Sequence, residues 1–150
     1  VKTPLGGNFD FTHLCGIHQY IFQDLYFWAG ECRSVEIAKG AMFCRAELLR
    51  REAARIFGDL SADLEKGKFR TEDAAECFAY HFSEINALHP FREGNGRAQR
   101  EFIRELALSQ GYLLEFSKIS AEEMLFASKE SFLCRYEPMS RVFALCLRKI

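Results

Sequence analysis

The twelve residues from His89 to Arg100 bring together side chains that suit phosphate chemistry. His89 is the residue type that best accepts a proton near neutral pH. Glu93 offers a hard oxygen ligand of the kind that Mg²⁺ accepts beside phosphates. The glycines of the turn from Gly94 to Gly96 let the backbone bend sharply and approach a ligand without a Cβ in the way. The stretch therefore predicts phosphoryl or nucleotidyl transfer.

A helix is expected to begin at the end of this stretch, over 96–110, with Gly111 closing it. Its unpaired first N–H groups and its positive dipole end would form an anion site facing the loop. Arg97, Arg100 and Arg104 fall at i, i+3 and i+7 and share one face. We expect the first two to reach a bound phosphate and Arg104 to lie on a solvated, salt-bridged face.

Periodic apolar residues predict the elements that must position this stretch. Three-to-four spacing indicates helices at 10–28, 46–64, 71–88, 96–110, 120–135 and 140–150, the fifth opened by a capping box at Ser120. Val35, Ile37, Met42 and Phe43 surround the Lys39-Gly40 dipeptide, which predicts a short β-hairpin. The 15 phenylalanines predict an aromatic core. We expect one all-α domain over 1–150 with a single small hairpin.

Composition narrows the range of partners. The 150 residues carry 20 Lys+Arg against 21 Asp+Glu, which argues against binding nucleic acid or a membrane surface through bulk charge. No apolar run approaches the roughly 20 residues that a membrane span needs. The six cysteines form no C-x-x-C pair and no secretory signal opens the chain, so we expect reduced thiols in a cytoplasmic protein.

The segment from His89 to Arg100 resembles, position for position, the signature H-x-F-x-(D/E)-G-N-G-R-x-x-R of the Fic (filamentation induced by cAMP) family. The segment from Asp24 to Gly30 resembles the family's helix-to-flap junction, and the Lys39-Gly40 hairpin resembles its flap. The resemblance implies the Fic fold, a compact helical bundle with a flap at about 34–44 and an active-site loop at 89–96. It also implies a bacterial toxin or effector.

The activity that the resemblance implies is transfer of AMP from ATP to a Tyr, Ser or Thr hydroxyl of a target protein, with release of pyrophosphate. His89 would be the base, Glu93 would hold Mg²⁺, and Phe91 would anchor the loop in the core. The phosphate-binding residues would be Gly94, Asn95, Gly96, Arg97 and Arg100. The target-binding residues of the flap, by β-augmentation, would be Ile37, Lys39, Gly40 and Met42.

Two alternatives concern the reaction and its control. One branch of the family replaces the Gly-Asn-Gly-Arg portion and transfers the γ-phosphate; that portion is intact here, which favours AMP transfer over phosphoryl or other nucleotidyl transfer.

Many members carry an inhibitory helix of pattern (S/T)-x-x-x-E-(G/N), whose Glu pairs with the position of Arg100. Only Ser61 has a Glu four residues on, and Lys66 follows it. A separate antitoxin-like protein, or a segment outside this sequence, would then supply the inhibition and hold the module inactive.

Other polar residues receive structural interpretations. Cys77 and His81 are four residues apart, with Glu84 three further on, a spacing that could bind zinc, but no fourth ligand follows at a matching spacing. Their metal-binding interpretation is therefore disfavoured. His13 and His18 are assigned no role. The arginines between 45 and 55 alternate with acids, which predicts an exposed, salt-bridged helix.

Overall fold

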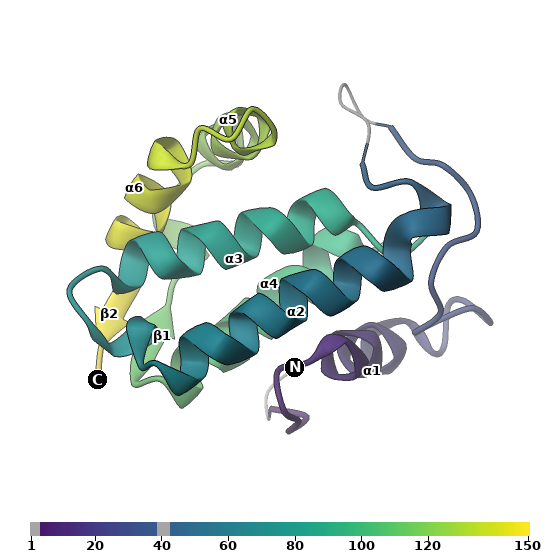
Figure 1. Ribbon diagram of the computed structural model, residues 1–150, viewed down its shortest axis with the longest axis horizontal. Helices are drawn as coiled ribbons and strands as arrows, with labels where there is room; N and C mark the ends of the chain where they lie inside the picture. Colours follow the sequence, from purple (N-terminus) through teal and green to yellow (C-terminus); the bar gives the residue numbers. More distant parts are fainter. Residues whose placement is uncertain (1–3, 39–42) are drawn as a thin grey trace.

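The computed structural model describes residues 4–38 and 43–150 (Figure 1). Its helices are α1 (Phe11–Phe22), α2 (Leu49–Glu65), α3 (Ala74–Leu88), α4 (Asn95–Ser109), α5 (Ala121–Phe132) and α6 (Glu137–Cys146). Short 3₁₀ turns occupy Ala46–Leu48, Lys68–Arg70 and Phe116–Lys118, and the strands are β1 (Tyr112–Leu114) and β2 (Leu147–Lys149). The mainly helical architecture confirms the predicted fold class.

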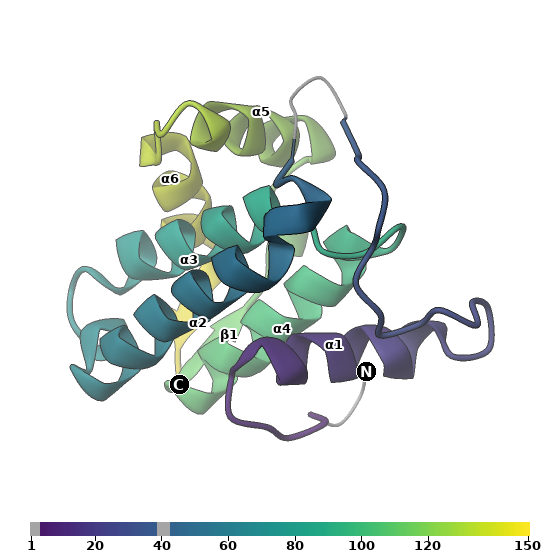
Figure 2. The ribbon, with the colours of Figure 1, turned by 45° about the vertical axis from the view of Figure 1, so that its right-hand side comes forward.

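Helix α3 is the centre of the bundle (Figures 1 and 2). It packs against α2, α4, α5 and α6, while α1 packs against α4 and α2. The sequence of α3 explains this position, because nine of its fifteen residues are buried. A helix that is apolar on most sides is stable only when other elements surround it. The loop that follows α3 is consequently held at one end of the core.

Aromatic rings fill much of that core, as the phenylalanine count predicts. Seven phenylalanines are almost fully buried: Phe22, Phe69, Phe78, Phe82, Phe91, Phe102 and Phe143. Many of the rings meet edge-on; those of Phe57 and Phe102, for example, lie 5.7 Å apart at 89°. Edge-to-face pairs of this kind stabilise a core beyond simple area burial. Buried apolar residues from α1 through α6 form one continuous cluster.

Helix α1 is shorter than the predicted helix over 10–28. It ends at Phe22, where hydrogen bonds from the N–H groups of Leu25 and Tyr26 to the Phe22 carbonyl turn the chain. The N–H of Gly30 then donates to Nδ1 of His18 at 2.9 Å, which brings the segment after the turn back against α1. A contact between a loop and a helix overrides the apolar periodicity that suggested a longer helix.

The bounds of α3 and α6 also differ from the prediction. Helix α3 begins at Ala74 rather than Thr71, because Thr71 is extended and its hydroxyl binds the Lys68 carbonyl and the Asp73 N–H. Helix α6 begins three residues before the expected start and ends at Cys146. The predicted capping box of α5 is confirmed, with Ser120 and Glu123 exchanging side-chain-to-backbone hydrogen bonds.

The two-stranded sheet does not lie where a hairpin was predicted. It pairs β1 with β2 antiparallel, Leu113 facing Arg148, so the last residues of the chain form a strand instead of continuing a helix. In the described part of 34–44, the Phe43 N–H donates to the Ile37 carbonyl at 3.4 Å and Ala38 forms a β-bridge, but neither arm is long enough to count as a strand. The predicted hairpin tip, with Lys39, Gly40 and Met42, lies outside the described residues. Across the described helices, none has the length and apolarity that crossing a bilayer demands.

Candidate active site

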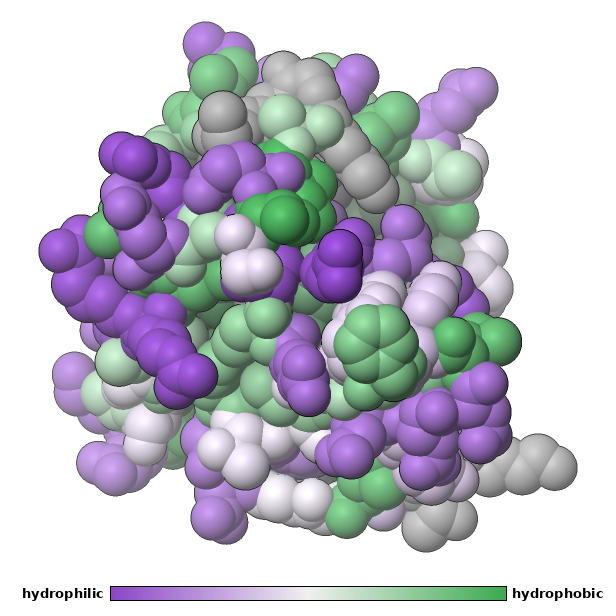
Figure 3. Space-filling view, turned by 90° about the vertical axis from the view of Figure 1, so that its right-hand side faces the viewer, coloured by the Kyte–Doolittle hydropathy of each residue, from purple (hydrophilic) through white to green (hydrophobic). Residues whose placement is uncertain are grey.

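The loop between α3 and α4 places the predicted site residues around one pocket. Helix α3 ends at Leu88 and is followed by His89, which takes the left-handed conformation (φ 46°), and α4 begins after Gly94, which also has positive φ (80°). The pocket has a volume of about 210 Å³. Its lining comprises Ile37, His89, Arg92, Glu93, Gly94, Asn95, Gly96, Arg97 and Arg100. Figure 3 views the end of the molecule that carries this loop, where hydrophilic and apolar side chains are interspersed.

Asn95 and Phe91 fix the shape of the loop. The Asn95 side chain accepts a hydrogen bond from the Phe91 N–H at 2.8 Å and donates one to the Phe91 carbonyl at 2.7 Å. The Phe91 ring is buried in the core, as an anchor must be. Both polar ends of the Asn95 amide are therefore used within the loop, so its side chain shapes the backbone around the pocket.

His18 of α1 packs against the same loop and supports it, a role that the sequence did not reveal. Its ring stacks on Phe91 with centroids 3.8 Å apart. Because Nδ1 accepts the Gly30 N–H, Nε2 carries the proton and donates to the Glu93 carbonyl at 2.8 Å. Burial lowers the pKa of His18, which favours this neutral form. No spacing in the sequence connects His18 to a loop 75 residues away.

The start of α4 lacks a side-chain cap. Gly94 provides no capping side chain, and the first turn contains no acidic residue. The first helical hydrogen bond runs from the Ala98 N–H to the Gly94 carbonyl, so the N–H groups before Ala98 precede the helical ladder. Uncapped N–H groups and the positive helix end favour a bound anion.

Three arginines and one glutamate surround this helix end. The guanidinium group of Arg97 lies over the Phe22 ring at 4.6 Å, and that of Arg92 lies over the Trp28 ring at 5.7 Å. Within residues 4–38 and 43–150, neither these arginines nor Arg100 and Glu93 form an ion pair. Their charges are consequently available to a ligand. Arg104 differs, as expected, because it pairs with Glu101 at 2.7 Å.

The His89 ring is held from the flap side. It stacks on Phe43 with ring centroids 3.7 Å apart and an angle of 7° between the planes. Phe43 in turn meets Phe132 of α5 edge-on at 5.3 Å. The ring thus has a fixed orientation at the wall of the pocket, which a proton-transfer group requires.

Arg33 joins the flap base to the end of α3, a role that no pattern in the sequence indicates. The residue is 3% exposed. Its Nε donates to the His89 carbonyl at 2.7 Å. Its two terminal nitrogens donate to three more carbonyls, those of Val35, Cys44 and Leu88. One buried guanidinium therefore connects both arms of the flap to the residue that bears the candidate base.

A second, larger pocket adjoins the first and shares Gly96 and Arg100 with it. Its volume is about 490 Å³, and α3, α4 and α5 contribute to its walls. Two of its lining residues are polar and buried, and Gln99 donates a hydrogen bond to Asn86 at 3.0 Å. The apolar part of the lining consists mainly of Phe82, Phe116, Ile119, Met124 and Leu125. Apolar walls with a few polar groups suit a flat heterocycle, next to a pocket that suits phosphates.

Replacing Gly94 with alanine is expected to lower the free energy of unfolding by about 3 kcal/mol. A Cβ at this position would clash with Cε2 and Cζ of the buried Phe22, and the backbone φ of 80° disfavours any L side chain. Urea denaturation measures the change. The control is Gly58→Ala in α2, where a Cβ meets nothing within 4 Å; it should gain about 0.5–1 kcal/mol. Equal effects of the two substitutions would contradict the close approach at Gly94.

Comparisons with known proteins identify the family to which this chain is similar. Residues 8–107 match the Fic/DOC family. The chain is 39% identical to the "Probable protein adenylyltransferase y4lH" of Sinorhizobium fredii, over 89% of this chain and 71% of that protein. It is 36% identical to the "Protein adenylyltransferase VbhT" of Bartonella schoenbuchensis, over 93% of this chain but only 29% of that protein.

Solved structures agree with this placement. The N-terminal Fic domain of a VirB-translocated effector from Bartonella quintana, solved with bound ADP, has a TM-score of 0.87 and 28% identity; the match covers 99% of this chain and 77% of the other. BepC from Bartonella tribocorum, solved with bound AMPPNP, has a TM-score of 0.86 and 25% identity, over 99% and 79% of the two chains. The chain belongs to the Fic/DOC family.

Proposed function

We propose that this protein transfers AMP from ATP to a hydroxyl side chain of a target protein and releases pyrophosphate. The observation that carries the proposal is the convergence of His89, one carboxylate, three arginines and an uncapped helix start on one pocket. Relatives named protein adenylyltransferases and family members solved with bound ADP or AMPPNP support it.

The triphosphate would bind at the start of α4. The backbone N–H groups from Gly94 to Arg97 would receive phosphate oxygens, and Gly96 would allow close approach of the backbone. Arg97 and Arg100 would bind the β- and γ-phosphates as charged donors. The adenosine moiety would occupy the adjoining pocket of about 490 Å³, which begins at Gly96 and Arg100.

Glu93 suits a Mg²⁺ ion beside those phosphates. It is exposed, lines the pocket and forms no ion pair with a described residue, so its carboxylate can serve as a hard oxygen ligand. Three arginines line the same pocket as that single carboxylate, and a bound polyphosphate would complete the set of oxygen ligands. When bound, Mg²⁺ neutralises charge on the polyphosphate as pyrophosphate departs.

His89 would accept the proton of the target hydroxyl. The hydroxyl oxygen then forms a bond to the α-phosphorus of ATP, and the bond between that phosphorus and the bridging oxygen of the β-phosphate breaks. The stack on Phe43 and the hydrogen bond from Arg33 to the His89 carbonyl would orient the imidazole for this step. A positioned base of this type contributes about 10²–10⁴-fold to the rate.

The flap would position the target. Ile37 lines the pocket from the flap side, which supports a role in holding the target segment near His89. An extended target segment would pair with the flap backbone, so that its hydroxyl is placed with little dependence on neighbouring side chains. Lys39, Gly40 and Met42 would complete this contact.

Labelled nucleotide tests the proposal. Purified protein is incubated with Mg²⁺, a bacterial lysate and ATP labelled on either the α- or the γ-phosphate. We expect protein-bound label from the α-phosphate and none from the γ-phosphate. Label from the γ-phosphate alone would mean phosphoryl transfer and would refute AMP transfer.

Control by a separate, antitoxin-like protein is a further part of this proposal. No Ser or Thr in the chain begins the family's inhibitory pattern. Arg100, the position with which the inhibitory Glu pairs in the family, forms no ion pair with a described residue and lines both pockets. A small helical protein that co-purifies, and whose Glu-to-Gln substitution restores α-phosphate labelling, would support this control; labelling unaffected by such a protein would refute it.

A further inference from the structure

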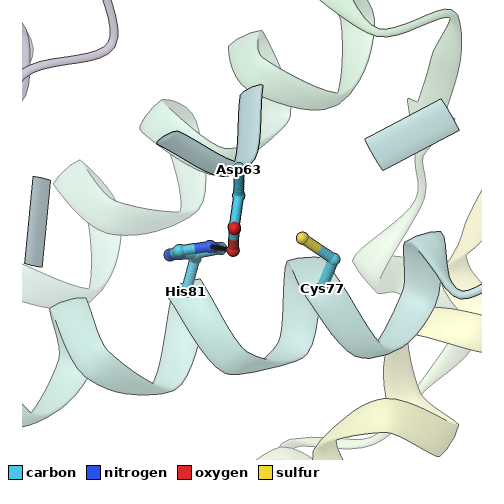
Figure 4. Close-up of side chains that lie close together, drawn as sticks. All are labelled: Asp63, Cys77 and His81. Carbon is cyan, nitrogen blue, oxygen red and sulfur yellow. Dashed lines mark hydrogen bonds and ion pairs between the residues drawn. The ribbon is translucent and has the colours of Figure 1, made fainter. Parts of the chain in front are cut away.

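Asp63, Cys77 and His81 form a cluster away from the active site. Cys77 and His81 lie one turn apart on α3, and Asp63 reaches them from α2 (Figure 4). One potential metal-binding atom from each of the three side chains lies within 4.8 Å of the other two. The sequence suggested Glu84 as a third ligand, but Glu84 binds Arg55 at 2.8 Å and Tyr136 at 3.3 Å instead. The third ligand-type residue comes from a different helix.

Neighbouring contacts already orient the Asp63 and His81 side chains. The His81 ring is 1% exposed, and its Nε2 lies 2.9 Å from Oδ2 of Asp63. The other carboxylate oxygen of Asp63, Oδ1, binds Nζ of Lys68 at 2.8 Å. Asp63 thus directs one oxygen into the cluster, while Lys68 fixes the other. A hydrogen-bonded second oxygen of this kind is the usual support of a metal-bound carboxylate.

The cluster opens onto a pocket of about 470 Å³, whose lining includes Asp63, Lys68, Cys77 and Glu76. A metal ion could therefore enter from solvent, and a water molecule or an added ligand could fill a fourth position. Three protein ligands with one open position are the arrangement of many zinc sites.

We propose that Asp63, Cys77 and His81 bind a divalent transition-metal ion of the Zn²⁺ class. A thiolate, an imidazole and a carboxylate together favour Zn²⁺ over Mg²⁺ or Ca²⁺, which prefer oxygen ligands alone. Bond lengths of about 2.0–2.3 Å in a tetrahedral site place ligand atoms about 3.5 Å apart. Nε2 of His81 and Oδ2 of Asp63, which lie 2.9 Å apart, would therefore separate slightly, and Sγ of Cys77 would move closer to them by up to about 1 Å. A rotation of the half-buried Cys77 side chain can supply such a movement.

The site would connect α2 to α3 at the far end of α3 from His89. At 1.5 Å per residue, Cys77 lies about 18 Å along the helix from His89. The metal would therefore stabilise the packing of α2 on α3 without contacting nucleotide, and the proposal does not depend on the reaction.

Cobalt(II) tests the site because its absorption spectrum reports thiolate coordination. The reduced, metal-free full chain is titrated with Co²⁺ in the absence of nucleotide. We expect a thiolate-to-cobalt charge-transfer band that saturates at one equivalent, together with tetrahedral d–d bands, and its loss when Zn²⁺ is added. Excess Mg²⁺ should leave the band unchanged.

Variants assign the band to these residues. Cys77→Ser should remove the charge-transfer band, and Asp63→Asn should weaken cobalt binding by about tenfold or more. Cys15→Ser removes another half-buried helical thiol and should leave the band intact. Far-ultraviolet circular dichroism establishes that each variant is folded. A wild-type protein without the band, or a band that persists in Cys77→Ser, would overturn the proposal.

Discussion

Replacing His89 with alanine is expected to slow AMP transfer by about 10²–10⁴-fold, the contribution of a positioned general base. Nucleotide affinity should stay nearly unchanged, because the start of α4 and its arginines remain. Initial rates of α-phosphate labelling measure the first quantity, and calorimetric titration with a non-hydrolysable ATP analogue measures the second. The two readouts separate loss of proton transfer from loss of the binding pocket.

His13→Gln is the matched control for this variant. His13 is also buried, but it binds Glu105 at 3.0 Å and does not line the pocket. We expect its rate of transfer to remain close to that of the wild type. An equal loss of rate in both variants would indicate a general structural effect, and full activity of His89→Ala would exclude His89 as the base.

Replacing Arg33 with methionine should produce the second large effect, a loss of about 3 kcal/mol in the free energy of unfolding. Methionine keeps the aliphatic stem but removes every donor, so four carbonyls lose a charge-assisted hydrogen bond in a buried environment. Transfer should also slow, because the His89 backbone loses its support from the flap base. Urea denaturation and the rate of α-phosphate labelling report the two effects.

An exposed arginine provides the comparison. Arg45 pairs with Glu47, and its side chain is 65% exposed. Arg45→Met should therefore cost less than about 1 kcal/mol, because surface ion pairs contribute little. If Arg33→Met were as mild as Arg45→Met, the buried guanidinium would not be what joins the flap to α3.

Local sequence patterns predicted the features that depend only on residues close together in the sequence, namely the helices, the capping box and the active-site loop. The apolar stripes of α2, α3 and α4 arise from a period that is visible in one segment, and the Ser120 capping box needs only four residues. The loop from His89 to Gly96 was equally predictable, because its histidine, its acid and its glycines all fall within one short segment of the sequence. The structure brings all of its predicted pocket residues together.

Such local patterns could not predict contacts between segments that are far apart in the sequence. His18, Arg33 and Asp63 each bind a partner that is distant in the sequence, 75, 56 and 18 residues away respectively, and no periodicity marks them. The β1–β2 sheet has strands of only three residues, too short for an alternating pattern to appear. Tertiary hydrogen bonds therefore decided these features, as they decided the early end of α1.

The mass of the modified target is the most direct test of AMP transfer. Wild-type protein, ATP and Mg²⁺ are incubated with the labelled target once it is isolated, and the target is analysed by intact-mass and fragmentation mass spectrometry. We predict an adduct with the mass of one AMP on a Tyr, Ser or Thr side chain, formed together with one pyrophosphate. An adduct with the mass of a single phosphate, or AMP addition that proceeds equally with His89→Ala, would contradict the account.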